Sequence, residues 1–267
     1  MIHPAMEFLG SLDPSAEAHF NIETYMDAKD KPNPDPLRRR FPTQTLEQVE
    51  LLLPNLEDLN QQGAAIYIAV NEFDGQRKLD NLARVRGVHA DLDDATEAQL
   101  LSMRNMLEPS IVVQSSSSNK QHWYWLLSDG EELAQDVAKA INQGFVPLGA
   151  DKAAVDVSRL LRLPGFDHMK TYNQERQILN NTDAPCVPPV VKILSTGPKY
   201  SAKTLLSSLP QRQQDNVTPS HGLSKDEAYN SVDLQPLIDE AIQHFQQDEP
   251  TLWKGDWKSI LSHLLGN

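Results

Sequence analysis

The chain has 267 residues, enough for one large domain or two smaller ones with their own cores. It is 39% hydrophobic and 23% charged, and no apolar run is long enough to predict a membrane span. The single cysteine, Cys186, excludes an internal disulfide and a cysteine-rich zinc site. The N-terminus lacks the basic start and apolar stretch of a secretory signal, so we expect a cytoplasmic protein.

The net charge of -13 disfavours a broad nucleic-acid-binding surface, which is normally basic. Net charge averages over the whole molecule, however, and a local cleft can still be positive. The basic residues gather in three groups, which are Arg38 to Arg40; Arg77, Lys78, Arg84 and Arg86; and Arg159, Arg162 and Lys170. We therefore expect any nucleic-acid binding to be local and sensitive to salt.

The first third of the chain predicts a short helix and then an extended segment within residues 1–30. Three prolines at alternate positions in 31–36 predict a loop, because proline disrupts regular backbone hydrogen bonding. Thr45 and Gln48 fit a capping box, which predicts the start of a helix. Pro54 is expected to end or kink that helix.

The middle of the chain alternates between strand and helix patterns. Short apolar runs predict strands at 64–70 and 85–92, and 96–107 predicts a helix. Two further runs, 111–113 and 122–127, predict a hairpin with a wide loop.

A helix is predicted at 131–145, followed by strand-like segments at 176–180 and 190–194. Strands and helices are thus intermixed, which indicates an α/β or α+β sheet domain.

The composition changes after about residue 200. Residues 205–224 are rich in Ser, Gln and Pro and predict a linker, followed by amphipathic helices at 232–246 and 257–265. We therefore divide the chain into a domain at 1–200 and a linker with a small helical accessory segment at 201–267.

The first candidate site is an Asp-x-Asp motif at the end of a predicted strand, formed by Asp91 and Asp93. Side chains alternate along a strand, so both carboxylates are expected on one face. Two adjacent carboxylates repel each other unless a cation lies between them, and Mg²⁺ prefers such oxygen ligands. An isolated Asp-x-Asp is a weak signal, and an acidic strand end in solvent is the alternative.

The second candidate site is a loop of small residues, Ser115 to Ser118, followed by Lys120 and then His122 at the start of a strand. Hydroxyl groups, loop amides and a lysine suit phosphate oxygens. Trp123 and Trp125 are interpreted as core residues. For His122 alone, a packed or surface histidine is the alternative.

The third candidate site contains Arg159 and Arg162. At a spacing of three they are expected on one side of a helical turn, where two guanidinium groups could bind a triphosphate. The alternative is a surface ion pair between Asp156 and Arg159.

The order of these motifs resembles that of the archaeo-eukaryotic primase superfamily. Its pattern is Asp-x-Asp after hydrophobic residues, a small-residue loop ending in His, and then a hydrophobic residue followed by Asp. In this chain, Asp91 and Asp93 match the first motif, Ser115 to His122 the second and Val155-Asp156 the third. The sequence at 159–165 is similar to the branch of RepB-like primases of plasmids and phages.

The resemblance covers roughly residues 5–195 and implies a fold and an activity. The fold would be an RRM-like antiparallel sheet as the catalytic core, fused to an N-terminal α/β module and followed by the short helical C-terminal segment. The activity would be a template-dependent DNA primase or polymerase. By the same resemblance, Asp91, Asp93 and Asp156 are the catalytic residues and the ligands of two Mg²⁺ or Mn²⁺ ions.

The resemblance also implies a pocket for the triphosphate of the incoming nucleotide. Its residues would be His122, Lys120, Arg159, Arg162, Ser116, Ser117 and Ser118. The implied partners are a single-stranded DNA template and ribo- or deoxynucleoside triphosphates, with a replicative helicase as a further candidate and no membrane.

The chain departs from the family pattern at three places. Lys120 stands where many members have serine, and Asp151 is a rival of Asp156 for the third carboxylate. Residues 251–257 resemble the start of a segment that follows the primase core in larger members. The accessory domain is therefore reduced, or the chain is a fragment of a longer protein.

Three alternatives remain open at this point. A phosphohydrolase of the haloacid dehalogenase type would need Thr or Val where the chain has Ala95. A non-catalytic replication or origin-binding protein could keep the fold, although the intact carboxylates disfavour it. A nuclease could use the same metal ions.

Overall fold

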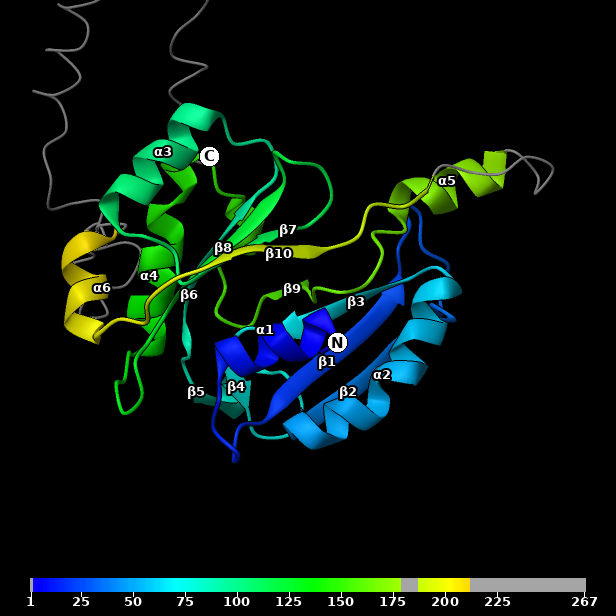
Figure 1. The fold of residues 1–267 in the computed structure, drawn as a ribbon, viewed down its shortest axis with the longest axis horizontal. Coiled ribbons are helices and arrows are strands. Elements are labelled where there is room, and N and C mark those ends of the chain that lie inside the picture. Colours follow the sequence, from blue (N-terminus) through cyan, green and yellow to red (C-terminus); the bar gives the residue numbers. More distant parts are fainter. Residues whose placement is uncertain (1, 179–186, 212–267) are drawn as a thin grey trace, which may run out of the picture. The chain divides into compact units, whose positions relative to one another are not determined.

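The computed structural model describes residues 2–178 and 187–211, which all lie in one compact unit. Two four-stranded antiparallel sheets dominate this unit (Figure 1). The helices predicted at 232–246 and 257–265 lie outside the described residues. None of the described helices is long and apolar enough to cross a membrane.

The N-terminal sheet has the strand order β2-β1-β3-β9. Its strands are β1 (Phe20–Met26), β2 (Arg39–Gln44), β3 (Ala64–Ala69) and β9 (Leu160–Arg162). Every neighbouring pair is antiparallel. The strand predicted at 64–70 is confirmed as β3, whereas β9 joins the sheet from almost a hundred residues further along the chain.

Two helices, α1 (Pro4–Leu12) and α2 (Leu46–Gln61), contribute to the core on one face of this sheet. The predicted capping box is confirmed, because Thr45 and Gln48 each accept a hydrogen bond from the other's backbone N–H. Of the two effects expected of Pro54, an end or a kink, the first does not occur, because α2 continues to Gln61. Pro54 lies on the exposed side, where the carbonyl that loses its partner is open to water, and buried Leu56 beyond it anchors the helix.

The second sheet, here called the primase sheet, has the strand order β10-β7-β8-β6. Its strands are β6 (Gly87–Leu92), β7 (Ile111–Gln114), β8 (Gln121–Leu126) and β10 (Lys192–Thr196). The helices between them are α3 (Glu97–Met106) and α4 (Gln135–Gly144). Apart from β9, which joins the N-terminal sheet, and α5, the chain order is β6-α3-β7-β8-α4-β10, the βαββαβ succession of ferredoxin-like and RRM-like domains. This confirms the predicted mixed fold and the β7–β8 hairpin.

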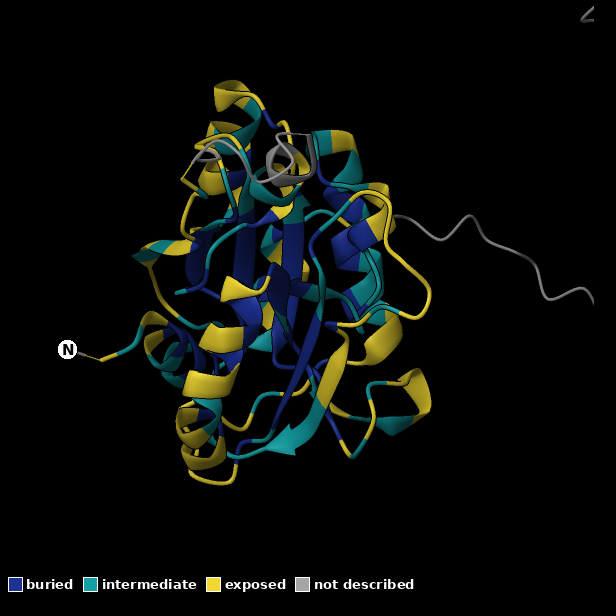
Figure 2. Cartoon of the chain, turned by 90° about the vertical axis from the view of Figure 1, so that its right-hand side faces the viewer, coloured by how far each residue is buried: buried dark blue, intermediate teal, exposed yellow. Residues whose placement is uncertain are grey.

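The two faces of the primase sheet pack into different cores. Trp123 and Trp125 on β8 lie in a cluster with residues of α3, α4 and the late helix α6 (Ala202–Ser208). Tyr124, between them in the chain, points to the other face and packs edge-on against Phe8 of α1. Both cores are seen as the buried strands inside a shell of more exposed helices and loops in Figure 2.

Shorter elements complete the described residues. They are β4 (Glu72–Phe73), β5 (Leu82–Arg84), α5 (Lys170–Ile178) and 3₁₀ turns at Leu79–Asn81, Val146–Leu148 and Lys152–Ala154.

Three further sequence predictions need correction. The strand-like segment at 176–180 falls largely in helix α5, and the helix predicted from 131 begins only at Gln135. The linker predicted from 205 begins instead as helix α6, because Leu205 and Leu209 are buried in the core on the tryptophan side of the primase sheet. The polar composition of this segment gave no indication that these two leucines are buried.

Candidate active site

Asp91 lies on the edge strand of the primase sheet, opposite His122 of β8. Val88, Ala90 and Leu92 of β6 are buried on the tryptophan side, so Asp91 points to the other face. Asp91 and His122 are partners in the β6–β8 register, and 3.5 Å separates Oδ1 of Asp91 from Nε2 of His122. The Asp91 side chain is 15% exposed. The strand register thus brings the first and second sequence motifs together.

Asp91 carries a buried charge that its surroundings leave poorly compensated. Burial and, after it, the neighbouring charge of Asp93 together raise the pKa of Asp91 to about 6, against the opposing effect of Arg159. Burial likewise lowers the pKa of His122 to about 3, so this histidine is neutral at neutral pH and cannot neutralise the acid. Among the described side chains, Nδ1 of His122 has no hydrogen-bond partner. A cation beside Asp91 would compensate its buried charge.

The serine-rich loop lies beside Asp93, just beyond the end of β6. Nζ of Lys120 is 3.5 Å from Oδ1 of Asp93, whose side chain is more than half exposed. Backbone hydrogen bonds from Ser115 to Lys120 and from Lys120 to Ser117 hold the loop closed. Ser117 and Ser118 are exposed, and Ser116 is half-buried. The second motif thus presents a lysine and hydroxyl groups at the open end of the site.

The two candidates for the third carboxylate differ in their contacts. Oδ1 of Asp156 is 2.6 Å from Nζ of Lys139 on α4. The backbone N–H of Asp151 instead donates to the carbonyl oxygen of Asp91 at 2.8 Å, and its carboxylate contributes to the raised pKa of Asp91. Asp151 is therefore the acid coupled to Asp91 here. Within residues 2–178 and 187–211, no group of three or more His, Cys, Asp or Glu side chains is arranged to hold a metal ion.

The two arginines do not lie on a helical turn, and that prediction is wrong. Arg162 is the last residue of strand β9, and Leu161 before it is buried in the core beneath the N-terminal sheet. Its guanidinium binds Asp27 in a bidentate manner, at 3.0 and 2.9 Å, and lies over the ring of Tyr67. Nε of Arg159 is buried without a hydrogen-bond partner in the described part of the chain.

Sequence reasoning missed Asp27 and Tyr67. Both lie on or next to strands of the N-terminal sheet, far from Arg162 in the chain. Neither stands in a motif-like context, so only the register of β1, β3 and β9 brings them to Arg162.

The structure thus brings together, on one antiparallel sheet, a buried aspartate, a neutral histidine and the small-residue loop that leads into the histidine. Residues 57–187 match the family model of the RepB DNA-primase N-terminal domain. The chain therefore contains a primase domain of the RepB-like branch of the archaeo-eukaryotic primases.

Solved structures of primases share this fold at low sequence identity. A crystal structure of primase RepB′ has a TM-score of 0.52 and 18% identity, covering 98% of this chain and 74% of that chain. The AEP domain of the cyanophage S-2L primase-polymerase has a TM-score of 0.54 and 18% identity, covering 77% and 97%. The catalytic domain of RepB′ in complex with initiator DNA has a TM-score of 0.51 and 18% identity, covering 92% and 100%. A comparison with curated proteins gave no match.

Proposed function

We propose that this chain is a template-dependent DNA primase that synthesises primers by two-metal nucleotidyl transfer, in the replication of a plasmid, phage or other mobile element. The observation that carries the proposal is Asp91, a buried carboxylate whose pKa is raised to about 6 beside a neutral His122. A carboxylate in that state has no structural partner that explains its burial. It is suited to binding a divalent cation, because the neutral imidazole of His122 provides no positive charge.

Asp91 and Asp93 supply the oxygen ligands that Mg²⁺ or Mn²⁺ prefers, and a third carboxylate completes the set. Two such ions, when bound, lower the pKa of the attacking 3′-hydroxyl and stabilise the leaving pyrophosphate. Asp156 is the third ligand by its motif position, and Asp151 is the alternative by its contact with Asp91. Phosphoryl transfer needs positioning and charge neutralisation, so the chain needs no covalent nucleophile.

The incoming nucleoside triphosphate is assigned to the groups around this acid pair. Lys120 and the serines of the loop supply donors at the open end, while His122 and Arg159 flank Asp91 from the interior. Arg162 adds positive charge that reaches Asp91 and His122, although Asp27 already occupies both terminal nitrogens of its guanidinium. The full proposed set is His122, Lys120, Arg159, Arg162, Ser116, Ser117 and Ser118.

The test is a primer-synthesis assay with the full chain, a single-stranded DNA template, and labelled ribo- or deoxynucleotides, in Mg²⁺ and in Mn²⁺. We expect short products from the wild-type protein and none from Asp91→Asn. Template binding without any product would favour a non-catalytic replication protein. Release of phosphate would favour a phosphohydrolase, and degradation of the template would favour a nuclease.

The region beyond the primase core is proposed to be separable from the chemistry. Because α6 packs into the core on the tryptophan side of the primase sheet, a truncation should end after Gln211 and not at 200. We expect residues 1–211 to extend an annealed primer, even where initiation or a helicase contact needs the rest.

A further inference from the structure

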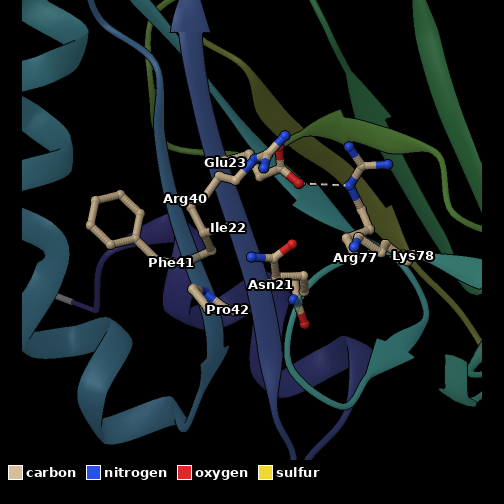
Figure 3. A pocket seen from close by; sticks show the side chains of 9 residues that line it. Asn21, Ile22, Glu23, Arg40, Phe41, Pro42, Arg77 and Lys78 are labelled. Atoms are coloured by element: carbon tan, nitrogen blue, oxygen red, sulfur yellow. Dashed lines mark hydrogen bonds and ion pairs between the residues drawn. The ribbon is translucent and has the colours of Figure 1, made fainter. Parts of the chain in front are cut away.

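The N-terminal sheet carries a cavity of about 260 Å³ that the catalytic motifs do not explain (Figure 3). It lies between β1, β2 and the loop at 76–78, on the face opposite the hydrophobic core. Its polar lining includes Asn21, Glu23, Arg40, Arg77 and Lys78. At this volume it is smaller than the roughly 300–1,000 Å³ of typical ligand pockets, so it suits a single small unit.

The cavity has a surplus of positive charge in a protein that is acidic as a whole. Glu23 is buried, and it pairs with Nε of Arg77 at 2.8 Å and Nε of Arg40 at 3.5 Å. Figure 3 shows the Glu23–Arg77 contact. Lys78 is exposed at the rim, so three cations surround one acid. Such an excess in a confined, partly buried space attracts an anion.

Asn21 adds an unpaired acceptor at the same place. Its side chain is almost completely buried, and Nδ2 donates to the carbonyl oxygen of Gly75 at 2.7 Å. That bond fixes the amide orientation and leaves Oδ1 as a buried acceptor with no partner among the described residues. An unpaired buried acceptor is destabilising, so a ligand that donates a hydrogen bond here would be favoured.

A row of side chains across the sheet leads from the cavity toward the candidate active site. The register places Arg40, Glu23, Tyr67 and Arg162 directly opposite one another on β2, β1, β3 and β9, so the four side chains share one face. At about 4.8 Å between strands, this row spans roughly 15 Å. Its far end, Arg162, acts electrostatically on Asp91 and His122.

The loop of the cavity is also tied to the catalytic segment. Nη1 of Arg77 donates to the carbonyl oxygen of Ser158 at 2.8 Å, immediately before Arg159. A group bound in the cavity is therefore connected to the candidate active site through both the polar face of the sheet and this loop.

We infer that the cavity binds one nucleotide of the single-stranded template, with its phosphate on Arg40 and Lys78 and a base donor on Oδ1 of Asn21. This inference rests on the proposed function, and it adds a place where the template is anchored. A phosphodiester brings one negative charge, which matches the modest surplus of the cavity. Adenine, cytosine and guanine offer amino donors and thymine an imino donor, so the site needs no particular base.

The experiment measures binding of the full chain to a fluorescent single-stranded oligonucleotide in metal-free buffer, across a range of salt concentrations. The test variant is Arg40→Gln with Lys78→Gln. The matched control is Arg104→Gln with Lys203→Gln, which removes the same charge from exposed positions on α3 and α6. We expect about tenfold weaker binding by the test variant at low salt, a salt slope reduced by about 0.7, and wild-type behaviour of the control.

The base contact is tested with an oligonucleotide that lacks bases, because replacing Asn21 would also release Gly75. The wild-type protein should prefer the normal strand, and the preference should shrink in the test variant. Equal losses in the test and control variants would overturn the inference. The inference would also be overturned if the test variant lost affinity for free nucleoside triphosphate and kept its affinity for the oligonucleotide. Absence of primer synthesis by the wild-type protein would overturn the proposed function alone, since the binding assay needs neither metal nor synthesis.

Discussion

Two groups of buried charge in this protein are balanced in opposite ways. Asp13, at the end of α1, binds Arg86 at 2.8 Å, and both side chains are at most 5% exposed. Burial acts to raise the pKa of Asp13, but the hydrogen bond and charge of Arg86 outweigh it, and the pKa is lowered. Asp91 is also buried, but its contact is a neutral His122, and its pKa is raised to about 6.

The difference separates a carboxylate that serves the fold from one that is available to a ligand. The Asp13–Arg86 pair, which Arg84 and Glu72 extend, places opposite charges against each other and joins α1 to the start of the primase sheet. Asp91 and Asp93 repel each other, and the protein retains them without a full counter-charge. The predictions below test whether this contrast is functional.

The largest effect should come from Asp91→Asn or Asp93→Asn, which we expect to reduce primer synthesis to background in Mg²⁺ and in Mn²⁺. Each removes a charged ligand without changing the shape of the side chain. Asp151→Asn and Asp156→Asn form a matched pair. The substitution that removes the true third ligand should reduce primer synthesis as much as Asp91→Asn does. Wild-type synthesis by the Asp91 or Asp93 variant would remove the central claim.

Asp13→Asn should leave the chemistry intact and weaken the fold. It leaves buried Arg86 with only the longer contact to Glu72 at 3.5 Å, and breaking such a buried pair costs up to about 3–5 kcal/mol. The measurement is the free energy of unfolding in urea, with primer synthesis assayed well below the transition. Unchanged stability would show that the pair is not structural.

Asp91→Asn should have the opposite effect on stability, raising the free energy of unfolding at neutral pH without metal by up to about 3 kcal/mol. The folded pKa of about 6 is above the unfolded value, so the folded state binds the proton more tightly between pH 4 and 6. Wild-type stability in metal-free buffer therefore falls as pH rises through this window, and the variant lacks that fall. Parallel curves for the two proteins would contradict the assignment.

The nucleotide contacts should give the smallest effects. Arg159→Ala and His122→Ala should each lower kcat/KM for the nucleotide roughly ten- to a hundredfold, as expected for one charge-assisted contact. Arg162→Ala should show the same loss together with a lower melting temperature, because Asp27 is then left buried and unpaired. Weakened template binding with unchanged nucleotide KM would show that this pocket is wrongly assigned.

The sequence predicted the primase sheet well because its signals are local. The alternation of β8 placed Trp123 and Trp125 in one core, and beside the N-terminal sheet the equally local capping box located the start of α2. The first two motifs meet because β6 and β8 are neighbours that bring Asp91 opposite His122.

The contacts of the third motif could not be predicted, since they depend on pairing between distant segments. The Leu-Leu-Arg pattern of β9 is compatible with a helical turn and with a strand, and only its pairing with β3 distinguishes the two structures. The same pairing gives Arg162 its partner Asp27, which is 135 residues away in the chain. The third carboxylate is uncertain for the same reason, because a loop and not a strand positions Asp151 and Asp156.

Helix α1 has a consequence for how this protein is made. Its Phe8 shares a core with Tyr124 of β8 and Val191 beside β10, so a helix that is synthesised early packs against a strand that is synthesised much later. Contacts of such high sequence separation slow folding, and the core cannot close until β10 has been synthesised. Until then the apolar side of α1 has no partner surface from the primase sheet. The nascent chain should therefore depend on chaperones up to that point in its translation.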